Sequence, residues 1–244
     1  MNLGDAAPGF AAAAGPAPAT VQAAVDAVMA GRHAVRAFLP REVPRATVVA
    51  ILASAGRAPS GTNLQPWRVH VLSGAVRQRL VDAVCAAYDS DEPGHRAEYD
   101  YYPAEFFEPY RARRRKIGFG LYGLLGIGKD DQARMRAQMR RNFEFFGAPV
   151  GLIFSIDRRM GQGSWLDYGM FLQNIMLAAR ARGLDTCPQV AWLDYHRIIA
   201  GVLGFGAREQ LVCGMSLGWA DPAAVENTLA TERAALEEFV VFHE

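Results

Sequence analysis

Two arginines, Arg32 and Arg36, stand four residues apart directly after the first helical pattern of the chain. A guanidinium group presents a planar fork of N–H donors that pairs with phosphate oxygens, and two of them at this spacing can converge on one dianion. The same pair could instead stabilise the negative carboxyl end of the preceding helix, which is a common role of basic residues at this position. The spacing alone leaves phosphate binding and helix-end stabilisation open.

A second candidate is the loop at residues 58–67, which reads APSGTNLQPW. It combines two prolines and a glycine with hydroxyl and amide side chains. Such a loop presents backbone and side-chain hydrogen-bonding groups of the kind that bind a polar heterocycle. The alternative is an ordinary turn in which Trp67 is anchored in the core.

These two segments occur in one order with several others further along the chain. R-x-x-x-R-x-F at 32–38 precedes the APSGTNLQPW loop, and Arg141 and Asn142 stand ahead of FGAP at 146–149. GLDTCPQ follows at 183–189, GMSLG at 214–218 and TER at 231–233. This series of motifs resembles the nitroreductase family of FMN-dependent oxidoreductases, and the resemblance covers residues 21–244.

The resemblance implies that FMN lies at the interface of an intertwined homodimer and is held by both subunits. By position it assigns cofactor contacts to these residues: Arg32, His33, Ala34, Arg36, Pro59, Ser60, Thr62, Asn142, Pro188, Gln189, Val190, Ala191, Thr231 and Arg233. Arg32, His33, Ala34 and Arg36 would form the first segment in contact with the phosphate and the ring. Arg233, with Thr231 beside it, would close on the phosphate from the C-terminal side, and Asn142 would reach the pyrimidine edge of the flavin. Residues 188–191 would lie along the isoalloxazine with one amide facing N5, and residues 59–62 would come from the second subunit.

The resemblance also implies the chemistry. NADH or NADPH would reduce the flavin, which would then reduce a small nitroaromatic or quinone-like acceptor in a ping-pong cycle. Arg36 is the candidate for electrostatic support, because a fixed positive charge near N1 and C2=O stabilises the anionic reduced flavin. The flavin carries the hydride, so no protein nucleophile is expected, and Cys187 is interpreted as a packing residue.

Three other functions remain open from the sequence. A reductive dehalogenase of halophenols would use the same fold and cofactor. A non-catalytic flavin-binding protein would hold FMN without a reductase role. A binder of aromatic metabolites would carry no flavin.

Residues 89–146 have no clean helical or strand period, and they correspond to the most variable, flavin-covering part of the family. Their aromatic side chains could stack on a flat substrate or pack against the partner subunit; they are Tyr99, Tyr101, Tyr102, Phe106, Phe107, Tyr110, Phe119 and Tyr122. The basic run RARRRK at 111–116 could recognise a substrate carboxylate or form a solvated helix face.

The composition limits the class of protein. Apolar residues make up 51% and charged residues 21% of the 244 residues, as in globular proteins. The 26 basic and 25 acidic residues nearly cancel, which argues against binding to nucleic acid or to a membrane surface. Three widely spaced cysteines exclude a disulfide scaffold or a cysteine metal cluster, and the five histidines have no metal-ligand spacing. No apolar run approaches ~20 residues, so we expect no transmembrane helix and a cytoplasmic protein.

Periodicity predicts an α+β fold with helices around a central mixed, mostly antiparallel sheet. Helices are expected at 21–31, 48–56, 76–88, 165–182 and 195–203, and strands at 68–72, 150–156, 210–217 and 239–242. Ser164 is expected to cap the helix at 165–182, with Asp167 completing a capping box. That helix is apolar nearly all round, so we expect it at a subunit interface. Residues 1–19, rich in Ala, Gly and Pro, are expected to form a flexible leader before a single domain at 20–244.

Overall fold

The computed structural model describes residues 19–244. The leader expected at 1–19 lies outside the described residues except for Ala19, which begins helix α1 (Ala19–Gly31). The other α-helices of the described chain are α2 (Arg45–Ala55), α3 (Gly74–Asp89), α4 (Tyr110–Leu124), α5 (Gln132–Arg140), α6 (Gln162–Arg180) and α7 (His196–Leu203). Its strands are β1 (Arg68–Leu72), β2 (Val150–Asp157), β3 (Asp185–Gln189) and β4 (Glu209–Gly218).

The four strands lie in the order β1-β2-β4-β3, and each neighbouring pair is antiparallel. An isolated parallel bridge between Ala34 and Thr186 brings the segment after α1 alongside β3. β2 and β4 are almost wholly buried because each lies between two other strands. The predicted α+β fold with a mostly antiparallel sheet is therefore confirmed.

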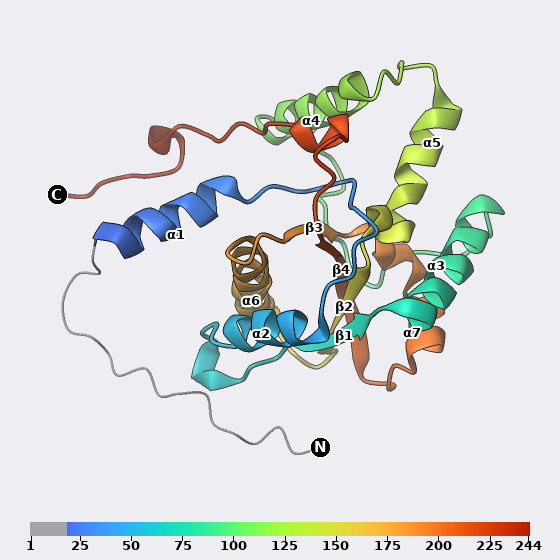
Figure 1. The fold of residues 1–244 in the computed structure, drawn as a ribbon, viewed down its shortest axis with the longest axis horizontal. Coiled ribbons are helices and arrows are strands. Elements are labelled where there is room, and N and C mark those ends of the chain that lie inside the picture. Colours follow the sequence, from blue (N-terminus) through green and yellow to red (C-terminus); the bar gives the residue numbers. More distant parts are fainter. Residues whose placement is uncertain (1–18) are drawn as a thin grey trace.

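Helices cover both faces of the sheet (Figure 1). α2 and α6 lie on one face, where Phe154 of β2 and Phe171 of α6 share a buried cluster. α3 and α7 lie on the other, where Ile153 of β2 and Ile199 of α7 share a second cluster. Successive side chains of a strand point to opposite faces, so β2 contributes to both halves of the core.

The sequence prediction was correct for β1 and missed β3. β1 spans the predicted residues 68–72, whose apolar and polar side chains alternate. β3 contains Asp185 and Pro188, residue types that are unfavourable in strands. Proline is tolerated there because β3 is an edge strand, where a missing N–H need not break the ladder.

The strand predicted at 239–242 is wrong. The tail instead contains a short 3-10 helix, η5 (Leu236–Glu238), and residues 239–244 are irregular. A strand is stable only where its backbone groups pair with a neighbour. Within residues 19–244 no strand lies beside this tail, and Phe239, Val241 and Phe242 are all exposed.

The predicted cap of α6 is also wrong. The helix begins at Gln162 with Gly161 as its N-cap, so Ser164 lies inside the first turn and its N–H donates to the Gly161 carbonyl at 3.0 Å. The carboxylate of Asp167 accepts the backbone N–H of Gly61 at 3.1 Å. Asp167 therefore links α6 to the loop at 58–67 and does not serve its own helix end.

α6 buries one side and exposes apolar groups on another. Tyr168, Phe171 and Ile175 are buried against the sheet and α2, whereas Leu166 and Met170 are 75% and 40% exposed. The predicted apolar surface all round this helix is thus only partly covered within the single chain.

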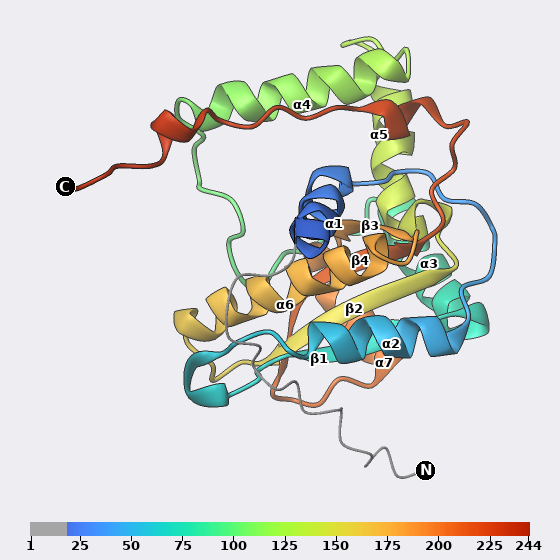
Figure 2. The same ribbon diagram turned by 60° about the vertical axis from the view of Figure 1, so that its left-hand side comes forward.

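α4 stands away from the sheet, and the C-terminal tail runs alongside it (Figure 2). Ion pairs join the two segments, from Arg113 to Glu238 and from Lys116 to Glu232. Among residues 19–244, no helix has both the length and the apolar character needed to cross a membrane.

Candidate functional site

A cavity of about 680 Å³ lies where the end of β3 meets two 3-10 helices, η2 (Arg141–Gly147) and η3 (Ala191–Tyr195). Its volume is in the range typical of small-molecule sites. Six of the fourteen predicted cofactor contacts line it: Arg36, Asn142, Pro188, Gln189, Val190 and Ala191. Segments far apart in the sequence therefore converge at one place.

Two strand glycines let η2 and η3 approach the sheet closely enough to form this cavity. A Cβ atom at Gly214 would lie 2.4 Å from the Trp192 ring, and one at Gly151 would lie 2.5 Å from the Phe145 ring. Real Cβ atoms do not approach other atoms so closely, so any larger residue at these positions would push a ring off the sheet. Phe145 has a φ of 53°, which is uncommon for a residue other than glycine. The strained turn and the glycines together set the position of η2.

The Gln189 side chain points into the protein. Its Nε2 donates to the Asn142 carbonyl at 2.6 Å, and its Oε1 accepts from the Ser216 hydroxyl at 2.9 Å. Both Gln189 and Ser216 are almost completely buried. Gln189 therefore ties β3, β4 and η2 together, and its amide group is engaged on both ends.

A single turn, η4 (Val225–Thr228), contacts two segments that form the cavity, the backbone at Arg36 and the start of η2. Asn227 Oδ1 accepts the backbone N–H of Arg36 at 2.8 Å and that of Ala37 at 3.2 Å. The buried carboxylate of Glu226 pairs with Arg141, the first residue of η2. Neither Asn227 nor Glu226 was identified from the sequence, because a lone amide or acid in an irregular segment carries no distinguishing pattern.

Arg36 stands beside Cys187 at the cavity wall. The backbone here is fixed by the Val35 N–H, which donates to the Thr186 carbonyl at 3.1 Å. Burial raises the pKa of the Cys187 thiol to about 11, although the nearby Arg36 charge lowers it. The thiol is therefore protonated at neutral pH, which agrees with its interpretation as a packing residue.

Four residues predicted to contact the phosphate do not line this cavity in the single chain: Arg32, His33, Thr231 and Arg233. The Arg233 guanidinium folds back on its own segment and donates to the Thr231 hydroxyl at 2.7 Å and to the Glu232 carbonyl at 3.0 Å. Arg32 and His33 directly follow α1, and His33 Nδ1 lies 3.2 Å from the Gly31 carbonyl. In the single chain these four residues are thus separate from the predicted ring contacts that line the cavity.

The loop at 58–67 lies beside the N-terminal end of α6 (Figure 2). Pro59, Ser60 and Thr62 do not line the cavity. Trp67 stacks on Phe171 with ring centroids 4.7 Å apart, which fits the predicted core anchor. Thr62 has a φ of 46°, and the Ser60 hydroxyl accepts the Gln65 N–H at 3.0 Å. The loop is held by its own hydrogen bonds and by Asp167, and most of its residues are exposed at the surface.

The aromatic residues of 89–146 fall into separate groups. Tyr99, Tyr101 and Tyr102 line the cavity, and Tyr99 is also fixed to the core by its hydroxyl, which donates to the Val212 carbonyl at 2.5 Å. Phe119 and Tyr122 belong to a different depression beside α4. Of the eight aromatic residues singled out in this segment, the three tyrosines at 99–102 therefore contribute to the cavity.

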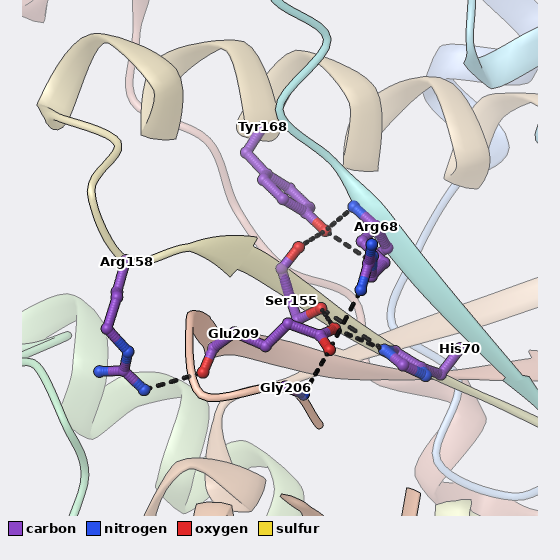
Figure 3. Close-up of polar contacts among 7 residues, drawn as sticks. All are labelled: Arg68, His70, Ser155, Arg158, Tyr168, Gly206 and Glu209. Atoms are coloured by element: carbon purple, nitrogen blue, oxygen red, sulfur yellow. Dashed lines mark hydrogen bonds and ion pairs between the residues drawn. The ribbon is translucent and has the colours of Figure 1, made fainter. Parts of the chain in front are cut away.

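A second polar cluster, absent from the sequence analysis, lies at the far end of β2 (Figure 3). Glu209 accepts from the Ser155 hydroxyl at 2.7 Å and from the Gly206 N–H at 2.9 Å, and it contacts His70 and Arg68 at 3.1 Å. Burial of the Glu209 carboxyl opposes its ionisation, but these hydrogen bonds and the Arg68 charge lower its pKa to about 2. The cluster sits at the register shift between Phe154 and Ser155, and it joins β1, β2 and β4.

The comparisons agree with this geometry. The sequence profile described as the nitroreductase family matches residues 29–219. The chain is 43% identical to the nitrobenzene nitroreductase of Ectopseudomonas oleovorans over 218 residues, 89% of this chain and 96% of that protein. It is 44% identical to the 4-nitrobenzoate reductase of Pseudomonas putida over 217 residues, 89% of this chain and 94% of that protein.

A solved structure is similar over the same extent. The FMN and NADPH-dependent nitroreductase NfnB from Sphigopyxis sp. strain HMH superimposes with a TM-score of 0.88 at 40% identity. The match covers 90% of this chain and 99% of that one. On the fold, the profile match and the extent of these similarities, the chain belongs to the nitroreductase family.

Proposed function

We propose that this protein is an FMN-dependent oxidoreductase that uses NAD(P)H to reduce nitroaromatic acceptors. The observation that carries the proposal is the convergence of Arg36, Asn142 and residues 188–191 on one cavity. Relatives named as reductases of nitrobenzene and 4-nitrobenzoate, and a similar structure named as FMN- and NADPH-dependent, support the same activity.

The groups in the cavity fit a flavin. Pro188, Val190 and Ala191 offer an apolar wall for the face of a flat ring, and Asn142 offers an amide for the polar pyrimidine edge. The first amides of η3 have no partner within that helix, so they are available to a ring nitrogen. Arg36 supplies a positive charge that would stabilise the anion formed on reduction. Bound FMN would supply the hydride chemistry. The protein would bind and orient the cofactor and stabilise the negative charge of its reduced form.

The remaining contacts require a second subunit in this proposal. Thr231 and Arg233, together with Arg32 and His33, would hold the FMN phosphate, and Pro59, Ser60 and Thr62 would reach the flavin of the other subunit. These residues lie outside the cavity and are exposed or half-buried in one chain, which favours this arrangement.

A homodimer is supported by the apolar groups that the single chain leaves in solvent. Val21 and Val25 of α1 and Leu166 and Met170 of α6 are exposed, as is the tail at 239–242. α1 packs against α6, and monomeric proteins rarely expose large contiguous apolar surfaces. Obligate interfaces bury more than ~2,000 Å² and resemble a core cut in half.

The decisive experiment is anaerobic turnover by the purified protein. The account predicts a yellow, FMN-loaded protein that oxidises NADPH or NADH only when nitrobenzene is added, with accumulation of the hydroxylamine. Flavin without turnover would instead indicate a flavin-binding protein, and a colourless protein that FMN cannot reconstitute would contradict every flavin-based function. Turnover with halophenols and none with nitroaromatics would replace the proposed acceptor class.

A further inference from the structure

Arg114 is the member of the basic run at 111–116 that lines the cavity. Its neighbours Arg113 and Lys116 are neutralised by Glu238 and Glu232 of the tail. Within residues 19–244, no carboxylate lies within ion-pair distance of Arg114. The α4 helix thus directs some of its charges to the tail and one, without an acidic partner, to the cavity.

Aromatic rings hold this guanidinium in place. Its central carbon lies 4.6 Å from the centroid of the Phe106 ring, a cation–π contact. Phe106 contacts Tyr102 at 5.5 Å between centroids, and Tyr102 contacts Tyr101 at 4.7 Å. Because both tyrosines line the cavity, the result is an aromatic strip that ends in a positive charge.

We propose that Arg114 is a specificity-determining residue that pairs with a carboxylate substituent on the nitroaromatic acceptor. The inference rests on the proposed function and adds the substrate class. An aromatic ring can lie against Tyr101 and Tyr102, and a planar guanidinium can bind a carboxylate through two parallel hydrogen bonds. The arrangement therefore selects nitroaromatic acids over neutral nitroaromatics.

Two acidic residues line the same cavity and would affect the binding of an anionic substrate. Asp100 and Asp194 also line it, and both are exposed. Neither is ion-paired with Arg114 in the described chain, so neither occupies the guanidinium. Each would repel an anionic substrate, and removing one should therefore act in the opposite direction from removing Arg114.

The test is the ratio of kcat/KM for 4-nitrobenzoate to that for nitrobenzene, measured with the FMN-loaded enzyme at fixed NADPH. Loss of a charge-assisted hydrogen-bonded pair predicts a fall of about tenfold to a hundredfold in this ratio for Arg114→Gln. Arg115→Gln removes the same charge from the next position, outside the cavity, and should leave the ratio within about twofold of wild type. Asp100→Asn should raise the ratio, and added salt should reduce the wild-type preference.

A second measurement, inhibition by benzoate, does not require the enzyme to reduce 4-nitrobenzoate. Benzoate should inhibit nitrobenzene reduction by wild type, and its inhibition constant should rise about tenfold or more in Arg114→Gln but not in Arg115→Gln. Equal ratios and equal benzoate inhibition in these two variants would overturn the inference while leaving the proposed function intact.

The donor's 2′-phosphate is the other anion that could meet Arg114. A loss in Arg114→Gln confined to NADPH, with NADH and the acceptor ratio unaffected, would assign the residue to the donor and overturn the inference. Failure of wild type to reduce either acceptor would contradict the proposed function itself.

Discussion

The side chain of Asn227 holds the backbone at Arg36 across 191 positions of sequence. Its Oδ1 accepts the Arg36 N–H at 2.8 Å, while its Nδ2 donates to the Ala37 and Asp221 carbonyls at 2.8 and 2.9 Å. The next residue back, Glu226, pairs with Arg141 at the start of η2. One short turn thus fixes two walls of the proposed flavin site, which makes η4 part of its positioning machinery.

Asn227→Ala should therefore lower both stability and FMN affinity. It leaves the Arg36 and Ala37 amides without their acceptor, which costs about 2 kcal/mol in the free energy of unfolding. Urea denaturation and FMN titration of the apoprotein would measure the two effects. Thr228→Ala removes only a local bond to the Val225 carbonyl and serves as the control. If both variants bound FMN as tightly as wild type, η4 would have no positioning role.

The hydrogen bonds of Gln189 predict that substitutions at Gln189 and Ser216 weaken FMN binding in a coupled way. Gln189→Leu should free η2 and weaken FMN binding about tenfold, and Ser216→Ala should produce a smaller loss, although Ser216 does not line the cavity. A double-mutant cycle between the two positions should give a coupling energy of about 1 kcal/mol. Additive effects would show that the Gln189 amide acts without Ser216.

Glu209 predicts a dependence of stability on acid. Its folded-state pKa of about 2 lies below the ordinary value of 4.5, so its ionised form stabilises the fold. This stabilisation is fully present above pH 4.5 and is lost as the pH falls from there through 2. The unfolding free energies of wild type and Glu209→Gln should accordingly differ by about 2 kcal/mol at pH 7, and the difference should narrow below pH 4.5 and vanish only below about pH 2.

The control for that series is Glu237→Gln, which changes an exposed tail residue. It should match wild type at every pH. A difference between wild type and Glu209→Gln that stayed constant from pH 7 to pH 2.5 would mean that the Glu209 charge does not stabilise the folded state.

Substitution of the three arginines Arg32, Arg233 and Arg36 should have different effects on FMN affinity and on the flavin reduction potential. Arg32→Ala and Arg233→Ala should purify partly without FMN and bind it about tenfold to a hundredfold more weakly, since each loses a charge-assisted bond to the phosphate. Riboflavin, which lacks the phosphate, should distinguish these variants from wild type far less. Arg36→Ala should instead lower the flavin reduction potential, because the reduced anion loses a compensating charge. Equal FMN affinity in wild type and Arg32→Ala would leave Arg32 with only its helix-end role.

Local patterns were sufficient for elements whose side chains alternate or recur within a few residues. β1 was predicted to the residue because its side chains alternate, and α6 to within a few residues because it is one long run of mostly apolar helix-forming residues. β3 was missed because its pairing with β4 overrides the strand propensity of Asp185 and Pro188. The tail at 239–242 has a strand-like composition, but within residues 19–244 no strand lies beside it, and composition cannot supply the partner.

In the candidate site, too, motifs were predictable from the sequence, whereas contacts between distant segments were not. Motif resemblance located Arg36, Asn142 and residues 188–191, which do meet at one cavity. It could not identify Asn227, since that residue acts through a contact made 191 positions away. Nor could it reveal that the Gln189 side chain faces inward, which depends on the register of β3 against β4.

The central claim is that the cavity between β3, η2 and η3 holds the flavin, and a crystal structure of the FMN-loaded protein tests it most directly. The account predicts the isoalloxazine against residues 188–191, with Asn142 and Arg36 at its pyrimidine edge and the phosphate between Arg32 and Arg233. It also predicts that Ser60 of a second subunit reaches the same flavin. Density for the ring elsewhere, or a flavin held within a monomer with Arg36 turned away from it, would contradict the account.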